Sequence, residues 1–174
     1  MSGRVGRAAG LPLVVTPRVG LPLVVPPLPP GATMALWPLA AVTEGSEPGL
    51  PLYVSAGKWL HPLFDLLELL SSEGPESGSE ERATLAAAGE LFLRDRVIGR
   101  AAAFLILRAG IRRAWADVVS DGAMALFATR GASLGAGELV PAIACRTESF
   151  LRDVDDPDIA WALLQQRRDG LAAG

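Results

Sequence analysis

Side chains that bind metals or form disulfides are scarce in this chain of 174 residues, which has one cysteine, Cys145, and one histidine, His61. A single cysteine forms no intramolecular disulfide, so nothing indicates an oxidising compartment, and we expect a cytoplasmic protein. A structural or catalytic zinc site needs at least three protein donors of the right type. The sequence therefore predicts no metal and no cofactor.

Charge is also sparse. Charged residues are 20% of the chain, the net charge is −3, and Lys58 is the only lysine. Nucleic-acid binding needs a basic face with aromatic side chains among the charges, and the sequence shows no such face. We therefore expect no nucleic-acid partner.

Long apolar runs without interruption are missing as well. The first 33 residues contain a repeat, Gly-Leu-Pro-Leu-Val-Val, at positions 10–15 and 20–25, and five more residues at 26–30 include four prolines. Proline removes backbone donors and blocks both helices and central strands, and a membrane helix needs roughly 20 continuous apolar residues. We expect no membrane span and a disordered extension over residues 1–33. A targeting segment and short edge strands packed on the domain are the alternatives. A single domain then spans 34–174.

The first half of this domain predicts a hairpin and a helix. Residues 35–42 are expected to form a strand, which Pro38 places at a sheet edge, and residues 50–55 the strand paired with it. The apolar spacing from Pro62 predicts a helix through Leu70. The polar stretch that follows predicts a loop insertion around residues 71–89.

The second half alternates strands with helices. Asp95 is expected to cap a helix that runs through Leu107 and ends at Gly110. The remaining elements expected are strands at 91–93, 115–119 and within 132–143, a helix from Ser120 to Thr129, and a last helix starting at Asp155–Asp158. This alternation predicts an α/β domain with a partly parallel sheet.

Several of these segments resemble a known family. The segment Asp95–Ala103 (Asp-Arg-Val-Ile-Gly-Arg-Ala-Ala-Ala) carries the most specific match. The looser matches are Ser55, Gly57, Pro62-Leu63, Ser120–Ala123, Val140–Arg146 and Asp155–Pro157. With this order of elements, residues 35–168 resemble domain-of-unknown-function family 1893. Arg96 stands where that family usually has lysine, and Cys145 where asparagine is expected.

The resemblance implies a three-layer α/β sandwich like that of the cytidine deaminases, with a mixed sheet and flanking helices. A zinc deaminase also needs a glutamate two residues after its histidine and a pair of cysteines. His61 is followed by Pro62 and Leu63, and Cys145 has no second cysteine. Zinc-dependent deamination is therefore excluded.

The expected site lies at the start of the helix near residue 99. Helix N-termini attract anions through free N–H groups, and guanidinium groups grip carboxylates or phosphates. Arg96, Gly99 and Arg100 are thus predicted to bind a small anionic or nucleoside-like ligand. In the alternative reading, Asp95 caps the helix and the arginines form surface ion pairs.

Other residues belong to competing hypotheses. Ser120 and Asp121, at a strand-to-helix turn, and Arg146 are further candidate ligand contacts, although capping explains the first two equally well. Cys145 is a candidate nucleophile for a thiol enzyme if His61 approaches it. A non-catalytic scaffold that forms a homodimer is the third possibility.

Overall fold

The computed structural model describes residues 24–43, 47–71 and 80–172. Within these ranges the strands are β1 (Met34–Pro38), β2 (Tyr53–Ser55), β3 (Leu91–Ile98), β4 (Arg113–Ser120) and β5 (Ser133–Val140). The helices are α1 (Leu39–Thr43), α2 (His61–Ser71), α3 (Glu80–Ala87), α4 (Arg100–Arg108), α5 (Asp121–Thr129), α6 (Arg146–Phe150) and α7 (Pro157–Ala172). The predicted alternation of strands and helices is present, and α1, α3 and α6 are helices that the sequence did not predict.

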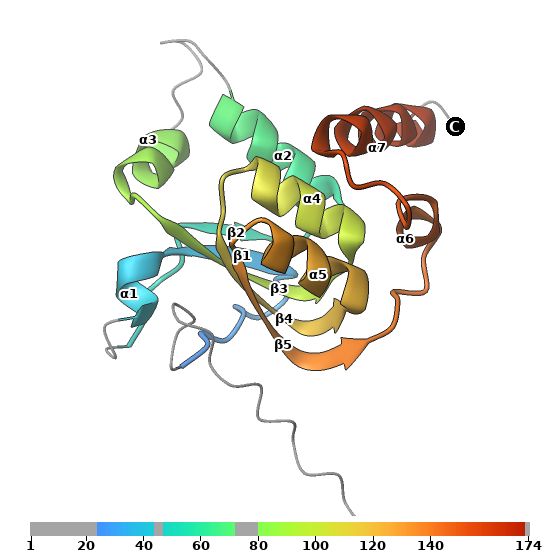
Figure 1. Cartoon of the computed structure of the whole chain (residues 1–174). Coiled ribbons are helices and arrows are strands. Elements are labelled where there is room, and N and C mark those ends of the chain that lie inside the picture. The colour runs from blue at the N-terminus through green and yellow to red at the C-terminus, as the bar shows by residue number, and fades with distance from the viewer. Residues whose placement is uncertain (1–23, 44–46, 72–79, 173–174) are drawn as a thin grey trace, which may run out of the picture.

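The strands form one open, mixed sheet in the order β2-β1-β3-β4-β5 (Figure 1). Strand β1 is antiparallel to both of its neighbours, β2 and β3. Strands β3, β4 and β5 are mutually parallel, and their connections are α4 and α5. The predicted α/β class with flanking helices is confirmed.

Most helices cover one face of the sheet. Helix α4 lies at the centre of this layer and contacts α2, α5 and α7 (Figure 1). Nearly every side chain of α4 is buried, including the run Ala101–Ala103 and Phe104. Small side chains let a helix lie close to a sheet while the larger ones fill the space around it. The larger apolar core lies between this layer and the sheet.

The opposite face has a thinner cover. Trp37 and Phe92 pack there with Val42 of α1, and residues Val25 and Leu28 pack against them. The molecule therefore has a helix layer, a sheet and a second, smaller layer. Val25 and Leu28, which precede the boundary predicted at residue 34, are part of that smaller layer. The remainder of the predicted extension, 1–23, lies outside the described residues.

Strand β1 corrects one prediction. Pro38 led us to expect an edge strand over 35–42, but β1 is central and ends at Pro38. The proline costs no central hydrogen bond because it is the last residue of the strand, paired with Leu91, and α1 begins directly after it. The sheet edges are β2 and β5 instead.

Two helix predictions also change. Asp95 belongs to β3 and does not cap α4, whose N-cap is Gly99. The strand continues because Leu91–Ile98 pairs with both neighbouring strands, which outweighs the local preference of aspartate for a helix cap. Within the predicted insertion 71–89, residues Glu80–Ala87 form a helix, and residues 72–79 lie outside the described ranges.

Other local predictions are confirmed. Gly110 and Gly131 follow the ends of α4 and α5 with positive φ angles of 79° and 65°. The Ser120 hydroxyl accepts a hydrogen bond from the Ala123 amide and caps α5. In the described part of the chain, no helix has the length and apolar character needed to cross a membrane.

Candidate functional site

A pocket of about 370 Å³ opens where β3 ends and α4 begins. We call it the α4 pocket. Its polar and charged lining residues are Thr33, Lys58, Asp95, Arg96, Cys145, Thr147 and Glu148. Gly57, Trp59, Leu60, Pro62, Leu63, Val97, Gly99, Ala101, Ala102 and Ile143 complete the wall. The carboxyl ends of parallel strands are where open α/β sheets bind ligands, so the pocket has the expected position.

Asp95 places a carboxyl group in this pocket. Its Oδ1 accepts the amide hydrogens of Arg96 and Val97, with N–O distances of 2.6 and 3.2 Å. Burial raises the pKa of Asp95 to about 6, against a smaller lowering by these two amides and by the Arg94 charge. A carboxyl group with this pKa exists in both protonation states near neutral pH and can exchange a proton with a ligand.

Glu148 occupies the start of α4. Its side chain is 8% exposed, and Oε2 accepts the Arg100 amide hydrogen at 2.6 Å. A Cβ atom at Gly99 would lie 2.5 Å from that oxygen, so only glycine leaves the carboxylate this close to the helix. The carboxylate of the protein itself therefore fills the position at which we predicted a bound anion. No acceptor for the amides of Ala101 and Ala102 lies among the described residues.

Trp59 forms part of the pocket wall. Its Nε1 donates to the Thr147 hydroxyl at 3.2 Å, and its ring packs against His61 and Phe64 at centroid distances of 5.2 and 6.1 Å. Its φ angle is +57°, in the left-handed region that a large side chain rarely adopts. Such strain persists where the surroundings enforce it, and it is concentrated at binding sites.

Two cationic side chains stand at the pocket. Lys58 and Arg96 are both exposed lining residues. Arg96 is tied to the N-terminal segment, because its Nε donates to the Ala32 carbonyl at 2.9 Å and its amide donates to the Thr33 carbonyl. The Thr33 hydroxyl in turn donates to the Gly57 carbonyl at 2.8 Å. Residues 32 and 33 thus hold both Arg96 and the loop that carries Lys58.

Arg100 has a different role from the one we predicted. It is 8% exposed, and its guanidinium donates to the carbonyls of Leu151 and Val154 and to the Asp155 carboxylate. It lines a second cavity beside Gly122 and does not line the α4 pocket. Arg96 and Arg100 therefore do not form a joint fork for an anion. Arg100 instead ties the chain after α6 to the start of α4.

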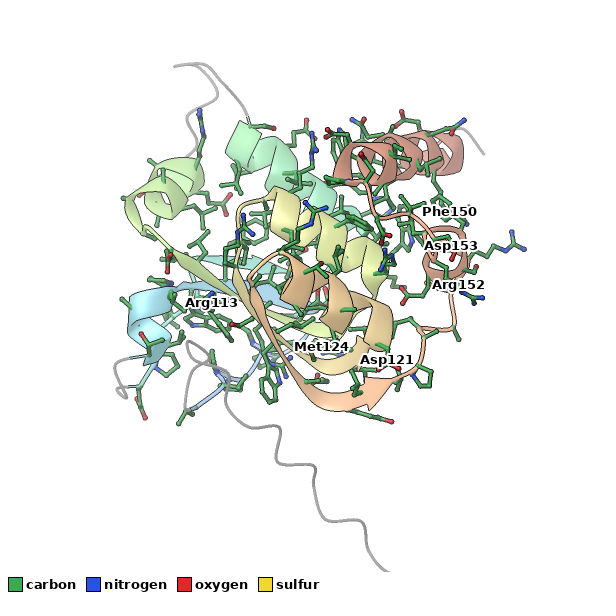
Figure 2. The ribbon with its side chains drawn as sticks, in the orientation of Figure 1. Arg113, Asp121, Met124, Phe150, Arg152 and Asp153 are labelled. Carbon is green, nitrogen blue, oxygen red and sulfur yellow. The ribbon has the colours of Figure 1, made fainter. Side chains whose placement is uncertain are left out.

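Three other predicted contacts also lie outside the pocket lining. Ser120 is fully buried as the cap of α5, and Asp121 is exposed at the first residue of that helix (Figure 2). Arg146 is exposed at the start of α6. The labelled Phe150 is the last residue of the same helix, and the labelled Arg152 and Asp153 follow it (Figure 2).

Cys145 lines both the α4 pocket and the second cavity. Its Sγ accepts the Glu148 amide hydrogen at 3.4 Å and caps α6. His61, the base expected for a thiol nucleophile, lies against Trp59 and is not a lining residue of the pocket. No group of three or more His, Cys, Asp or Glu side chains that could hold a metal occurs within the described ranges.

Sequence reasoning missed four of the residues that shape this site: Thr33, Lys58, Trp59 and Glu148. The pattern around Glu148 gave one usable signal, since Cys-Arg-Thr-Glu at 145–148 places a glutamate three residues after a capping side chain, as in the start of many helices. Its contact with Arg100, 48 residues away, has no local signature. The left-handed backbone conformation of Trp59 also has no local signature in the sequence.

Comparisons with known proteins agree with this architecture. Residues 82–167 match the sequence model of a family described as TM1506, domain of unknown function (DUF1893). Among solved structures, the chain is similar to a DUF1893 family protein (TM1506) from Thermotoga maritima, with a TM-score of 0.57. The two share 18% identity over 78% of this chain and 80% of that chain, so the likeness concerns the fold. No curated protein matches the chain. The two matches support the family predicted from the Asp95–Ala103 segment.

Proposed function

We propose that this chain, which resembles the DUF1893 family in fold and in the sequence of residues 82–167, binds a small anionic or nucleoside-like ligand without a metal. The α4 pocket carries the proposal. Its volume of about 370 Å³ falls in the range of small-molecule sites, which are mostly apolar with a few polar groups that fix orientation. Trp59, Leu60 and Leu63 supply apolar surface, and Asp95 and Arg96 supply polar groups.

The contacts of the arginines lead us to propose other residues for the anionic group than those predicted from the sequence. Arg100 and the start of α4 are occupied by contacts within the protein. Lys58 and Arg96 are the cationic side chains of the pocket lining, so they are the groups that contact an anionic substituent in our proposal. The resemblance to the family implies a fold like that of the cytidine deaminases, and a ligand of nucleoside size is compatible with that implication.

The test is a thermal-shift screen of the full chain against nucleosides, nucleotides and simple anions. A ligand at a hundredfold excess over its Kd stabilises the protein by about 2.7 kcal/mol, which raises the Tm by about 5–10 °C for a chain of this size. We expect Arg96→Ala to remove most of this shift.

The matched control is Arg112→Ala. Arg112 is exposed, does not line the α4 pocket and makes its side-chain hydrogen bond to the Arg130 carbonyl. This variant loses the same charge and should keep the ligand response of the original chain. Absence of any shift across the panel, or equal effects of the two variants, would contradict the proposal.

A thiol-dependent enzyme is the second candidate, because Cys145 is an exposed thiol in the pocket wall. This candidate predicts that iodoacetamide modifies Cys145 much faster than a free thiol and that a bound ligand protects it. A rate equal to that of free cysteine would count against it. The homodimeric scaffold stays a prediction from the sequence.

A further inference from the structure

The Asp95 carboxylate lines the α4 pocket and keeps an oxygen that can accept a hydrogen bond from a ligand. Within the described residues only its Oδ1 accepts hydrogen bonds, and both come from backbone amides. Asp95 takes part in no ion pair there, because the neighbouring Arg94 bonds to the Asp117 carboxylate and to the Asp95 carbonyl. A half-buried carboxylate with an oxygen that makes no hydrogen bond within the described residues offers an acceptor to a ligand N–H group.

The walls around this carboxylate favour a flat partner. Trp59 is 37% exposed, and a hydrogen bond to Thr147 and ring contacts with His61 and Phe64 position its indole at the pocket. Indole rings attract planar cations and stack on planar rings. Leu60 and Leu63 continue the apolar wall. A compact, strongly hydrated ammonium ion would cover less of this apolar surface than a planar ring does.

From this geometry we propose that Asp95 recognises the ligand, and that the ligand presents a planar ring with an amidine-like N–H edge. This inference rests on the proposed function, and it names the ligand class of the same site. The N–H edge donates to the free carboxylate oxygen, and the ring lies against Trp59. An anionic substituent on the other side of such a ring reaches Arg96 or Lys58.

The experiment uses benzamidine, benzamide and benzoate, which share one ring and nearly one shape. They differ in charge and in the number of N–H donors, so the series isolates the group that meets Asp95. Titration calorimetry of the full chain at pH 8 should show benzamidine binding at least about tenfold tighter than benzamide, with benzoate weakest. Each tenfold step corresponds to about 1.4 kcal/mol.

The variant is Asp95→Asn, which keeps an oxygen for the amides of Arg96 and Val97 and removes the charge. We expect it to weaken benzamidine at least about tenfold and to leave benzamide nearly unchanged. Asp121→Asn is the matched control, because Asp121 is an exposed carboxylate that does not line the pocket. It should bind benzamidine like the original chain.

Three outcomes would overturn the inference. The first is benzoate binding as tightly as benzamidine, and the second is an unchanged benzamidine affinity in Asp95→Asn. The third is binding of none of the three probes while nucleotides still raise the Tm in an Arg96-dependent way, which leaves the proposed function intact. If neither the probes nor the wider panel binds, the proposed function fails together with this inference.

Discussion

Asp95 carries a carboxyl group whose pKa lies well above its usual value. The sequence pointed to the segment that begins with Asp95, but it predicted a helix cap. The structure places the residue in β3 instead, with its side chain in a pocket. An aspartate before an apolar run is a sound local signal for a cap, and strand pairing on both sides overrode it. A carboxylate that merely capped a helix would have a lowered pKa, whereas the pKa of Asp95 is raised to about 6.

This raised pKa makes stability depend on pH in a defined direction. A carboxyl group whose folded-state pKa exceeds its unfolded value holds its proton more tightly in the folded chain. Its contribution to the free energy of unfolding is therefore largest at low pH, and it falls as pH rises from about 4 to about 6. The charged side chains around this group are Lys58, Arg94 and Arg96, with Asp117 on β4 and Glu148 on α6.

We predict that Asp95→Asn removes this fall. At pH 8 the variant should be more stable than the original chain by about 1–3 kcal/mol, since one pKa unit corresponds to about 1.4 kcal/mol. Near pH 4 the two should be nearly equal. Urea unfolding at a series of pH values measures this difference. A variant that is less stable than the original chain at pH 8 would show that the Asp95 charge is favourably compensated in the fold.

At the scale of elements, the start of α4 depends on a segment far along the chain. Glu148 of α6 caps the first amide of α4, and Arg100 reaches the carbonyls of Leu151 and Val154 that follow α6. The sequence predicted α4, its end at Gly110 and the cap of α5 at Ser120, because those features are local. It could not predict the α4–α6 contacts, because nothing near residue 100 specifies a partner about 50 residues away.

Arg100→Ala should therefore lower the stability of the fold, because Arg100 does not line the α4 pocket. We predict a loss of about 2–4 kcal/mol in the free energy of unfolding, because the carbonyls of the buried Leu151 and the half-buried Val154 lose a charged donor. The control is Arg108→Ala, whose ion pair with Asp158 spans 3.3 Å between exposed side chains and should cost less than about 1 kcal/mol. Urea unfolding measures both. Equal losses of stability in the two variants would mean that the buried contacts of Arg100 contribute no more than an exposed ion pair.

At the scale of the whole molecule, the described residues 24–33 contact the sheet and the pocket. Val25 and Leu28 cover Trp37 and Phe92 on the second face of the sheet. The density of proline in this segment predicted disorder, since proline prevents regular secondary structure. That argument holds for helices and strands, but it does not exclude packing as an irregular chain. The segment contributes Thr33 to the pocket lining, so the site is incomplete without it.

A chain that begins at Met34 should show this dependence. Exposure of the second face of the sheet should cost about 2–4 kcal/mol and lower the Tm by about 4–16 °C. Loss of the Ala32 and Thr33 carbonyls also releases Arg96, so ligand should raise the Tm little or not at all. A chain that begins at residue 24 keeps these contacts and should respond like the full chain. An unchanged ligand response in the shorter chain would place Arg96 outside the site.

The central claim is that the α4 pocket binds the ligand, and the indole N–H signals of the four tryptophans report on it most directly. We would record ¹H–¹⁵N correlation spectra of the full chain during titration with benzamidine and with any nucleotide that raises the Tm, with Trp59→Phe identifying one signal. The account predicts that the Trp59 signal moves with saturation while the signals of Trp37 and Trp161 stay in place. A saturable shift confined to Trp161, or no shift of Trp59, would contradict it.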